Sequence, residues 1–283
     1  MRRLLFLLAI TAATIPVWAG RIQTDSIKSQ KLGVTVKYNV YLPDGFDRSQ
    51  QHYPLTFLLH GLTDIYTAWD ERGKMREIAD ELIESGEAAQ MVIVMPNAGG
   101  PDVNNTWNGY FNMPQWPYED FIFQELMPQV EQKYRCGGSK QQRAVMGLSM
   151  GGGGSTVYCQ RHPDLFSACY AMSPWLNSGP GRTGKNGEKT KMYYTSEAVR
   201  QHSALDFIDR ADDNVKNQLK TVSWFFDCGD DDMLLNDTFE LYKKMRLAGI
   251  KAELRVRNGG HTWEYWRQAL RTALPFVSRS FSK

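Results

Sequence analysis

The sequence predicts an α/β fold in which a mostly parallel central sheet carries helices on both faces. After about residue 50, short β-like runs alternate with segments of helical spacing, which is typical of such sheets. The runs "YPLTFLLHG" (53–61) and "QMVIVMPN" (90–97) are continuously apolar, as expected for strands buried on both faces. No repeat or break in composition divides the chain, and α/β domains of ~250 residues are common. One domain is therefore predicted over residues 20–283.

The predicted elements follow one another along the chain with the spacing of this fold class. In order, they are an antiparallel edge strand (33–43), two strands (53–61 and 90–97) that flank a helix (74–85), a helix with a kink at Pro128 (118–134), a strand (142–149), a small-residue helix from Met150, two strands (166–173 and 221–229), a helix (237–248), the last strand (251–260) and a final helix (about 262–281).

Two stretches fall outside this alternation, residues 99–117 and 174–200. Both are polar and rich in Gly, Pro and aromatic residues, and both are predicted to be long loops. Long loops in a compact domain are usually functional or disordered. Because both leave the carboxyl ends of predicted strands, where open α/β sheets bind ligands, we expect them to border a binding site.

Residues 1–19 are predicted to be a cleaved export signal. The segment "MRRLLFLLAITAATIPVWAG" has two arginines, then an apolar stretch, then small residues where a signal peptidase cleaves. A membrane anchor is the alternative, but the apolar stretch is shorter than the ~20 residues that span a bilayer and is interrupted by Thr11, Thr14 and Pro16. We therefore expect a secreted or periplasmic protein with no stable membrane insertion after cleavage.

The charge balance argues against nucleic acid as a partner. The whole chain has 33 basic and 31 acidic residues, and removal of residues 1–19 takes away Arg2 and Arg3 but no acid, which leaves 31 of each sign. No long run of one charge is present. A basic face of the kind that attracts nucleic acid is therefore not predicted.

The four cysteines do not form a recognisable pattern. In an exported chain they could form two disulfides, but they lack the dense spacing of a disulfide scaffold and the CxxC pairs of a metal site. Their pairing stays open at this point, for Cys136, Cys159, Cys169 and Cys228.

Residues 144–155 read "AVMGLSMGGGGS" and contain the pattern GxSxG around Ser149. The pattern alone is weak, but here it lies directly between a predicted strand and a predicted helix. In that context it is typical of a nucleophile elbow, a tight turn that exposes a serine at a strand end while glycines let backbone segments approach closely. Ser149 is therefore the predicted nucleophile, in preference to a serine in a flexible glycine spacer.

A nucleophilic serine requires a base, which in turn requires an orienting acid. After a nucleophile elbow the chain order is Ser, then Asp or Glu, then His. His261 follows the last predicted strand directly, after two glycines, and is the predicted base. The other histidines precede the serine, close its helix or have no strand to hold them: His52, His60, His162 and His202.

The orienting acid is expected at the end of the preceding strand, in "FFDCGDDDMLL". Asp227 still lies within the strand pattern and is expected to pair locally. Spacing alone does not choose among the three aspartates that follow, Asp230, Asp231 and Asp232, although the loop pattern favours Asp232.

Acyl transfer also requires hydrogen-bond donors for the oxyanion that forms on the substrate carbonyl. The backbone amide of Met150, directly after the nucleophile, is one predicted donor. The amide of Leu62, in the loop after "TFLLHG", is the other. His60 is expected to shape this loop without acting in catalysis.

Several motifs together resemble the putative-esterase family of α/β hydrolases over residues 33–280. They are "LLHGLTDIYTAW", "VIVMPNAGG", "ELMPQVEQKY", "AVMGLSMGGGGSTVYCQRHPDLFSACYAMS", "CGDDDMLL" and "GGHTWEYW". That family includes carbohydrate esterase family 1 (feruloyl and acetylxylan esterases), tributyrin-type esterases and S-formylglutathione hydrolases. The resemblance implies the α/β-hydrolase fold, Ser149 as nucleophile, Asp232 as acid, His261 as base and the amides of Leu62 and Met150 as oxyanion donors.

The expected activity is that of an exported serine esterase that releases feruloyl or acetyl groups from plant polysaccharide esters, without a metal or organic cofactor. Trp107 and Trp175, in the two long loops, are candidate substrate contacts, whereas Trp263 and Trp266 are expected to pack the last helix. The alternatives are a short-chain acyl esterase of the tributyrin type, an acyltransferase with the same triad and a carbohydrate-binding protein without the chemistry. A peptidase is disfavoured because the chain has little room for a further lid or domain.

Overall fold

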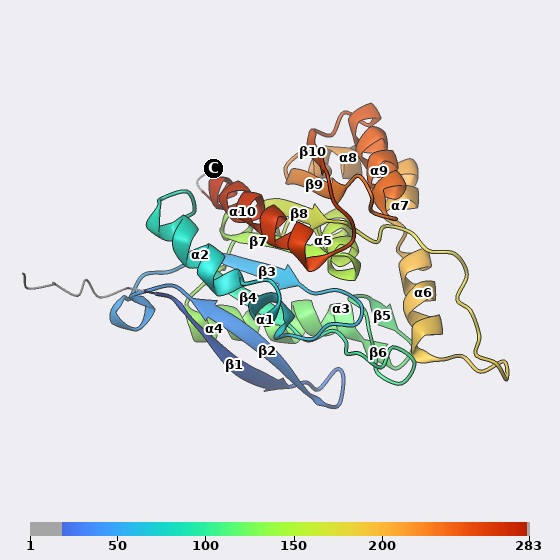
Figure 1. Ribbon diagram of the computed structural model, residues 1–283, viewed down its shortest axis with the longest axis horizontal. Coiled ribbons are helices and arrows are strands. Elements are labelled where there is room, and N and C mark those ends of the chain that lie inside the picture. Colours follow the sequence, from blue (N-terminus) through green and yellow to red (C-terminus); the bar gives the residue numbers. More distant parts are fainter. Residues whose placement is uncertain (1–18, 282–283) are drawn as a thin grey trace, which may run out of the picture.

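The computed structural model describes residues 19–281, so the predicted export signal lies outside the described residues except for Ala19. The main sheet is formed by eight strands of this part of the chain in the order β1-β2-β4-β3-β7-β8-β9-β10 (Figure 1). Their bounds are β1 (Arg21–Lys28), β2 (Thr35–Leu42), β3 (Leu55–Leu59), β4 (Val92–Pro96), β7 (Arg143–Leu148), β8 (Ala168–Met172), β9 (Ser223–Gly229) and β10 (Ala252–Arg257). Neighbours from β4 to β10 are parallel, which confirms the predicted sheet.

Helices cover both faces of the sheet (Figure 1). The α-helices are α1 (Ala68–Glu71), α2 (Met75–Glu84), α3 (Tyr118–Phe121), α4 (Met127–Tyr134), α5 (Met150–Arg161), α6 (Lys191–Gln201), α7 (Ala204–Arg210), α8 (Asp213–Leu219), α9 (Leu235–Leu247) and α10 (Trp263–Ser280). Buried apolar residues form two clusters, one beneath α2 and α10 and one beneath α3 to α5 and α9. Each face of the sheet therefore has its own core, and every helix within residues 19–281 is too short or too polar to span a bilayer.

The first strand of the sheet was not predicted. β1 reads "RIQTDSIK" and lies largely exposed at the edge, where it pairs antiparallel with β2. The prediction that residues 33–43 form an edge strand is therefore wrong, because β2 lies between β1 and β4. β1 is polar and contains no apolar run by which a strand could be recognised. Ile27 is the one residue of this strand that is buried.

The predicted helix over 118–134 is present with an interruption. α3 continues into a π-helical turn, η2 (Ile122–Leu126), which leads into α4 with Pro128 in its first turn. Proline lacks the amide that would bond the carbonyl four residues earlier, and π-helical turns are one way in which a helix accommodates such a gap.

The two stretches predicted as loops contain short elements. Residues 99–117 include the paired strands β5 (Asn112–Met113) and β6 (Trp116–Pro117), and residues 174–200 end within α6. Neither α6 nor the following helices α7 and α8 were predicted. Their ends are capped by side chains of Thr190, Ser203 and Asp212, which accept hydrogen bonds from the amides three residues later. These caps were a signal that could have revealed them.

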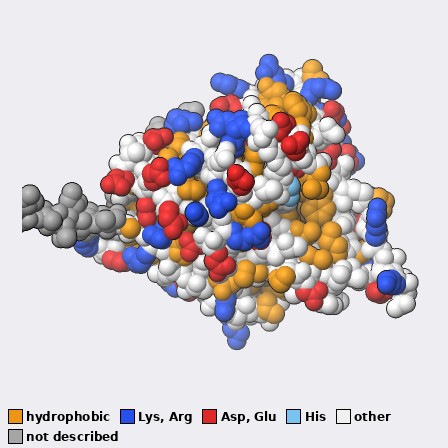
Figure 2. Space-filling model, viewed as in Figure 1, with side chains coloured by type: hydrophobic (Ala, Val, Ile, Leu, Met, Phe, Trp, Pro, Cys, Tyr) orange, Lys and Arg blue, Asp and Glu red, His pale blue; other side chains and the backbone are white. Residues whose placement is uncertain are grey.

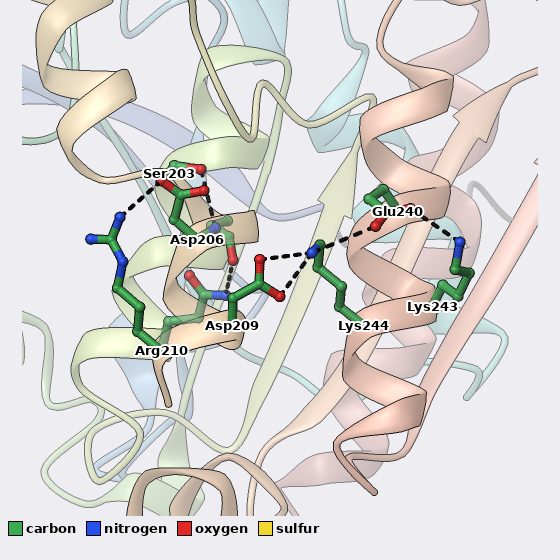
Figure 3. A network of polar contacts seen from close by, with 9 residues as sticks. Ser203, Asp206, Asp209, Arg210, Glu240, Lys243 and Lys244 are labelled. Atoms are coloured by element: carbon green, nitrogen blue, oxygen red, sulfur yellow. Dashed lines mark hydrogen bonds and ion pairs between the residues drawn. The ribbon is translucent and has the colours of Figure 1, made fainter. Parts of the chain in front are cut away.

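A network of charged side chains joins α7 to α9 beside the sheet (Figure 3). The ammonium of Lys244 lies 2.8 Å from the carboxylate of Asp209 and 3.5 Å from that of Glu240. The side chain of Asp209 is 53% exposed, so this is a surface ion pair, which typically contributes little to stability. All four cysteines of the chain are buried free thiols.

Candidate active site

Ser149 lies in a strained turn between β7 and α5. Its backbone angles are φ 54° and ψ −117°, a region that non-glycine residues rarely occupy. The turn is held from both sides, because the Ser149 amide donates to the Met172 carbonyl and the Trp175 amide donates to the Ser149 carbonyl, each at 2.9 Å. The hydroxyl is thereby fixed at the carboxyl edge of the sheet.

The glycines after Ser149 permit close packing and do not form a flexible spacer. They form the first turn of α5, where Gly151 lies against the carbonyl of Leu59 at the end of β3. A Cβ on Gly153 would collide with the carbonyl oxygen of Trp175. The small residues therefore hold the serine turn close to the loops on either side of it.

Three side chains from distant parts of the sequence meet at this edge. Nε2 of His261 lies 2.9 Å from Oγ of Ser149, and Nδ1 of the same ring lies 2.8 Å from Oδ2 of Asp232. Ser149 follows β7, Asp232 follows β9 and His261 follows β10. The arrangement can therefore transfer a proton from the hydroxyl to the imidazole while the carboxylate orients the ring.

Asp232 is held as an anion beneath the imidazole. Burial acts to raise the pKa of its carboxyl, but hydrogen bonds from His261, from the amide of Leu234 and from the hydroxyl of Ser173 outweigh burial and lower the pKa below its ordinary value. Ser173 was not singled out from the sequence. Its hydroxyl also accepts a hydrogen bond from the indole of Trp266, at 3.1 Å.

The neighbouring aspartates have other partners. Asp230 and Asp231 are exposed, and Asp230 accepts a hydrogen bond from the amide of Gly259, which ties the loop after β9 to the loop that carries His261. Asp227 is fully buried and accepts hydrogen bonds from the hydroxyls of Tyr170 and Tyr265. It pairs within the fold and does not reach the serine.

The two candidate oxyanion donors flank Ser149. Met150 is the first residue of α5, so its amide has no partner within the helix. Leu62 lines the same cavity as Ser149, and a Cβ built on the preceding Gly61 would be 3.7 Å from Cβ of Ser149. Neither amide donates a hydrogen bond to another residue within 19–281, so both are free to bind a carbonyl oxygen.

His60 lies buried beneath the loop that contains Leu62. Its Nδ1 donates to the Gly61 carbonyl at 2.8 Å, and its Nε2 accepts from the Ala98 amide at 2.9 Å. Burial lowers the pKa of the ring to about 4, although the bond to Gly61 acts in the opposite direction. The ring is therefore neutral and shapes the loop.

The burial of His60 makes the free energy of unfolding depend on pH. Between pH ~6.5 and pH ~4 the unfolded chain binds a proton at this ring and the folded chain does not, so stability should fall by about 3 kcal/mol as the pH falls through this range. Urea unfolding of the wild type and of His60→Gln at several pH values measures the effect. We expect a smaller loss on acidification in the variant, and equal losses would contradict this account of His60.

Ser149 and His261 open into an apolar cavity of about 650 Å³. Figure 2 shows hydrophobic side chains around the hollow in which a histidine is visible. The aromatic residues of its lining are Trp175, Trp263 and Trp266, and methionines at its border are Met192 and Met233. Trp263 and Trp266 therefore contact the cavity as well as packing α10, which sequence reasoning did not predict.

The two candidate substrate contacts lie in different places. Trp175 lines the cavity beside Ser149, whereas Trp107 lies outside its lining and stacks on Trp116, with ring centroids 5.7 Å apart. A further unpredicted feature is the ion pair of Arg72 and Asp64 at the cavity border, at 2.7 Å. No group of three or more His, Cys, Asp or Glu side chains within residues 19–281 is arranged to hold a metal ion.

Comparisons with known proteins identify the family of the chain. Residues 29–277 match the family described as "Putative esterase". A curated relative, an endo-1,4-beta-xylanase/feruloyl esterase of Xylanibacter ruminicola, is 28% identical over 258 residues, which cover 89% of this chain. The chain spans only 30% of the length of that relative.

The chain is also similar to solved structures of esterases. A ferulic acid esterase is 44% identical, covers 93% of this chain with 99% of its own, and superimposes with a TM-score of 0.89. A ferulic acid esterase of Anaeromyces mucronatus, solved with ferulic acid, is 20% identical with a TM-score of 0.73 over 95% of this chain and 94% of its own. The second likeness shows the fold alone.

Proposed function

The chain belongs to the putative-esterase family of serine carboxylic-ester hydrolases, and from that premise we propose that it releases feruloyl groups from plant polysaccharide esters through an acyl-enzyme intermediate. The observation that carries the proposal is the hydrogen-bonded series from Asp232 through His261 to Ser149, which opens into an aromatic cavity. The names of the ferulic acid esterase and of the bifunctional xylanase relative support the choice of acyl group.

In the first half of the reaction, Oγ of Ser149 attacks the ester carbonyl carbon and its proton moves to Nε2 of His261. The carbonyl oxygen becomes an oxyanion that the amides of Leu62 and Met150 stabilise, and one such donor is worth ~3 kcal/mol in the transition state. Asp232 stabilises the imidazolium without taking its proton. When the tetrahedral intermediate collapses, the bond from the carbonyl carbon to the sugar oxygen breaks, and His261 donates the proton to that oxygen, which leaves as a hydroxyl group.

The second half repeats these steps with water. His261 accepts a proton from the water molecule that attacks the acyl-serine carbonyl, and the carbonyl oxygen again lies between the two amides. Collapse of the second intermediate breaks the bond to Ser149, and the proton returns to Oγ. The acid is released and the serine is restored.

The cavity supports an aromatic acyl group. Its volume of about 650 Å³ is in the range, roughly 300 to 1,000 Å³, of sites that hold ligands of ring size and above. The three indole rings in its lining suit a planar aromatic group, which can stack on an indole face or contact it edge to face. An acetyl group would leave most of this surface unused.

Hydrolysis of methyl ferulate and of methyl butyrate tests the choice of acyl group, because the two esters share the leaving alcohol. We expect kcat/KM to be at least about tenfold higher for methyl ferulate, which corresponds to ~1.4 kcal/mol of additional binding in the transition state. Trp175→Ala should lower kcat/KM for methyl ferulate and change that for methyl butyrate little. Equal values for the two esters would favour the short-chain esterase, and ester exchange with an added alcohol would favour the acyltransferase.

We also propose that the chain is exported and cleaved after Ala19. The amide of Gly20 donates to the carboxylate of Asp80 at 2.8 Å, and Asp80 also accepts from the hydroxyl of Tyr41. The ammonium created at Gly20 by cleavage would therefore lie beside a carboxylate that already has a hydrogen-bond partner. Sequencing of the amino terminus of the protein recovered outside the cytoplasm should begin at Gly20, and a start elsewhere would contradict the proposal.

A further inference from the structure

A second hollow lies beside the catalytic cavity, on the other side of the first turn of α6. Its volume is about 570 Å³, and it is bordered by Asn104, Asn105, Gly184, Lys185, Glu188, Lys189, Thr190, Lys191 and Tyr194. Lys191 borders this hollow and the next residue, Met192, borders the catalytic cavity. Since successive residues of a helix point about 100° apart, one turn of α6 separates the two sites.

The hollow has an excess of positive charge. Its border includes three lysines, Lys185, Lys189 and Lys191, and one carboxylate, Glu188. None of the three lysines forms an ion pair within residues 19–281. Figure 2 shows basic side chains on the part of the molecule that projects at the right of the view, where Figure 1 has α6 and the loop before it.

Aromatic rings accompany two of these lysines. The ammonium of Lys191 lies over the ring of Trp107, 3.3 Å from its centroid, and that of Lys189 lies over the ring of Tyr193 at 4.9 Å. Desolvation lowers the pKa of Lys191. Trp107 and Tyr194 are themselves in contact, with centroids 5.9 Å apart. The faces of Trp107 and Tyr193 are therefore covered by ammonium groups, and the aromatic side chain that borders the hollow itself is Tyr194.

We propose that this hollow binds a uronic acid side group of the polysaccharide whose ester occupies the catalytic cavity. The lysines would bind the carboxylate, the amides of Asn104 and Asn105 would hydrogen-bond sugar hydroxyls, and the ring of Tyr194 would contact the apolar face of the sugar. Glu188 can accept hydrogen bonds from sugar hydroxyls. No arginine borders the hollow, although arginine is the residue that suits phosphate best.

The inference rests on the proposed function, since it concerns the same polysaccharide, but its test does not require ester cleavage. The full chain with Ser149→Ala is titrated calorimetrically with a xylo-oligosaccharide that carries a glucuronic acid side group and with a neutral xylo-oligosaccharide of the same length. We expect the acidic ligand to bind at least about tenfold more tightly at low salt, and the preference to shrink as salt is added.

A triple substitution identifies the lysines responsible. Lys185→Gln, Lys189→Gln and Lys191→Gln together should abolish the preference for the acidic ligand. A control with Lys28→Gln, Lys31→Gln and Lys37→Gln, which changes the net charge equally at exposed positions of β1, β2 and the turn between them, should retain it. In the background with Ser149 intact, neither triple substitution should change kcat/KM for methyl ferulate, which has no sugar.

Equal affinity for the two oligosaccharides, or equal loss of affinity in the two triple variants, would contradict the proposal. Tighter binding of a short single-stranded DNA through the same lysines would contradict it as well, because it would identify a general polyanion site. If methyl ferulate is not hydrolysed but the acidic oligosaccharide still binds more tightly than the neutral one, the proposed ester substrate is wrong and the proposed uronic acid site still stands.

Discussion

Ser149→Ala is expected to lower kcat for methyl ferulate by about 10⁶-fold, because in the proposed mechanism its hydroxyl forms the covalent intermediate. The fold should be unaffected, since the alanine Cβ occupies the place of the serine Cβ and the turn is held by backbone hydrogen bonds. The measurement is steady-state hydrolysis at enzyme concentrations high enough to detect the residual rate, together with thermal unfolding. Activity within tenfold of the wild type would show that Ser149 is not the nucleophile.

A companion variant separates the strain of the turn from the chemistry. Ser149→Gly should also abolish turnover but should raise the free energy of unfolding by ~1 to 2 kcal/mol relative to Ser149→Ala. Glycine adopts a backbone with φ 54° and ψ −117° without the clash that a Cβ causes. Equal or lower stability of the glycine variant in urea unfolding would show that the turn is not strained.

Asp232→Asn is expected to lower kcat by ~10⁴-fold, the second large effect. An asparagine amide can occupy the same space, but it cannot stabilise the imidazolium as a carboxylate does and it favours the wrong tautomer of His261. KM should change little, because Asp232 is buried beneath the ring and does not line the cavity.

The chain supplies a matched control for this variant. Asp231→Asn makes the same chemical change at the preceding residue, whose side chain is exposed, and should leave kcat within about twofold of the wild type. A larger loss in Asp231→Asn than in Asp232→Asn would mean that the acid has been assigned to the wrong aspartate.

The sheet could be predicted where its strands are buried on both faces. β3, β4, β7, β8 and β9 all read as largely apolar runs, because most side chains between two helical layers have no access to water. The same criterion misses β1, whose stability comes from pairing with β2 rather than from burial of its own side chains. Whether a strand lies at the edge of a sheet depends on which strands pair with it, so the position of β2 could not be inferred from its own sequence.

The helices beside the cavity depend on contacts that the sequence does not display. α6 begins at a threonine cap, and its first amide donates to the carbonyl of Asn104 in the other long stretch. That contact joins segments more than eighty residues apart, and neither is strongly apolar. Trp263 and Trp266 could be assigned to the last helix from the sequence. Their contact with the cavity could not, because it depends on where the loop that carries His261 places the start of α10.

The contact of Ser149, Asp232 and His261 was easier to predict than the lining of the cavity, because the proposed chemistry restricts these three positions more strongly. The serine required a strand-to-helix turn, and the histidine required a position after the last strand, which only His261 satisfied. The choice of Asp232 among three consecutive aspartates depended on side-chain direction. The structure shows that direction, since Asp232 alone of the three is buried and lies against the ring.

Covalent labelling of the serine tests the central claim most directly. The protein is treated with a fluorophosphonate, digested, and analysed by mass spectrometry in parallel with measurements of remaining activity against methyl ferulate. We predict that one phosphonyl group attaches to the peptide that contains Ser149 in proportion to the activity lost, and that Ser149→Ala takes up none. Complete inhibition with the label on a different residue would contradict the account.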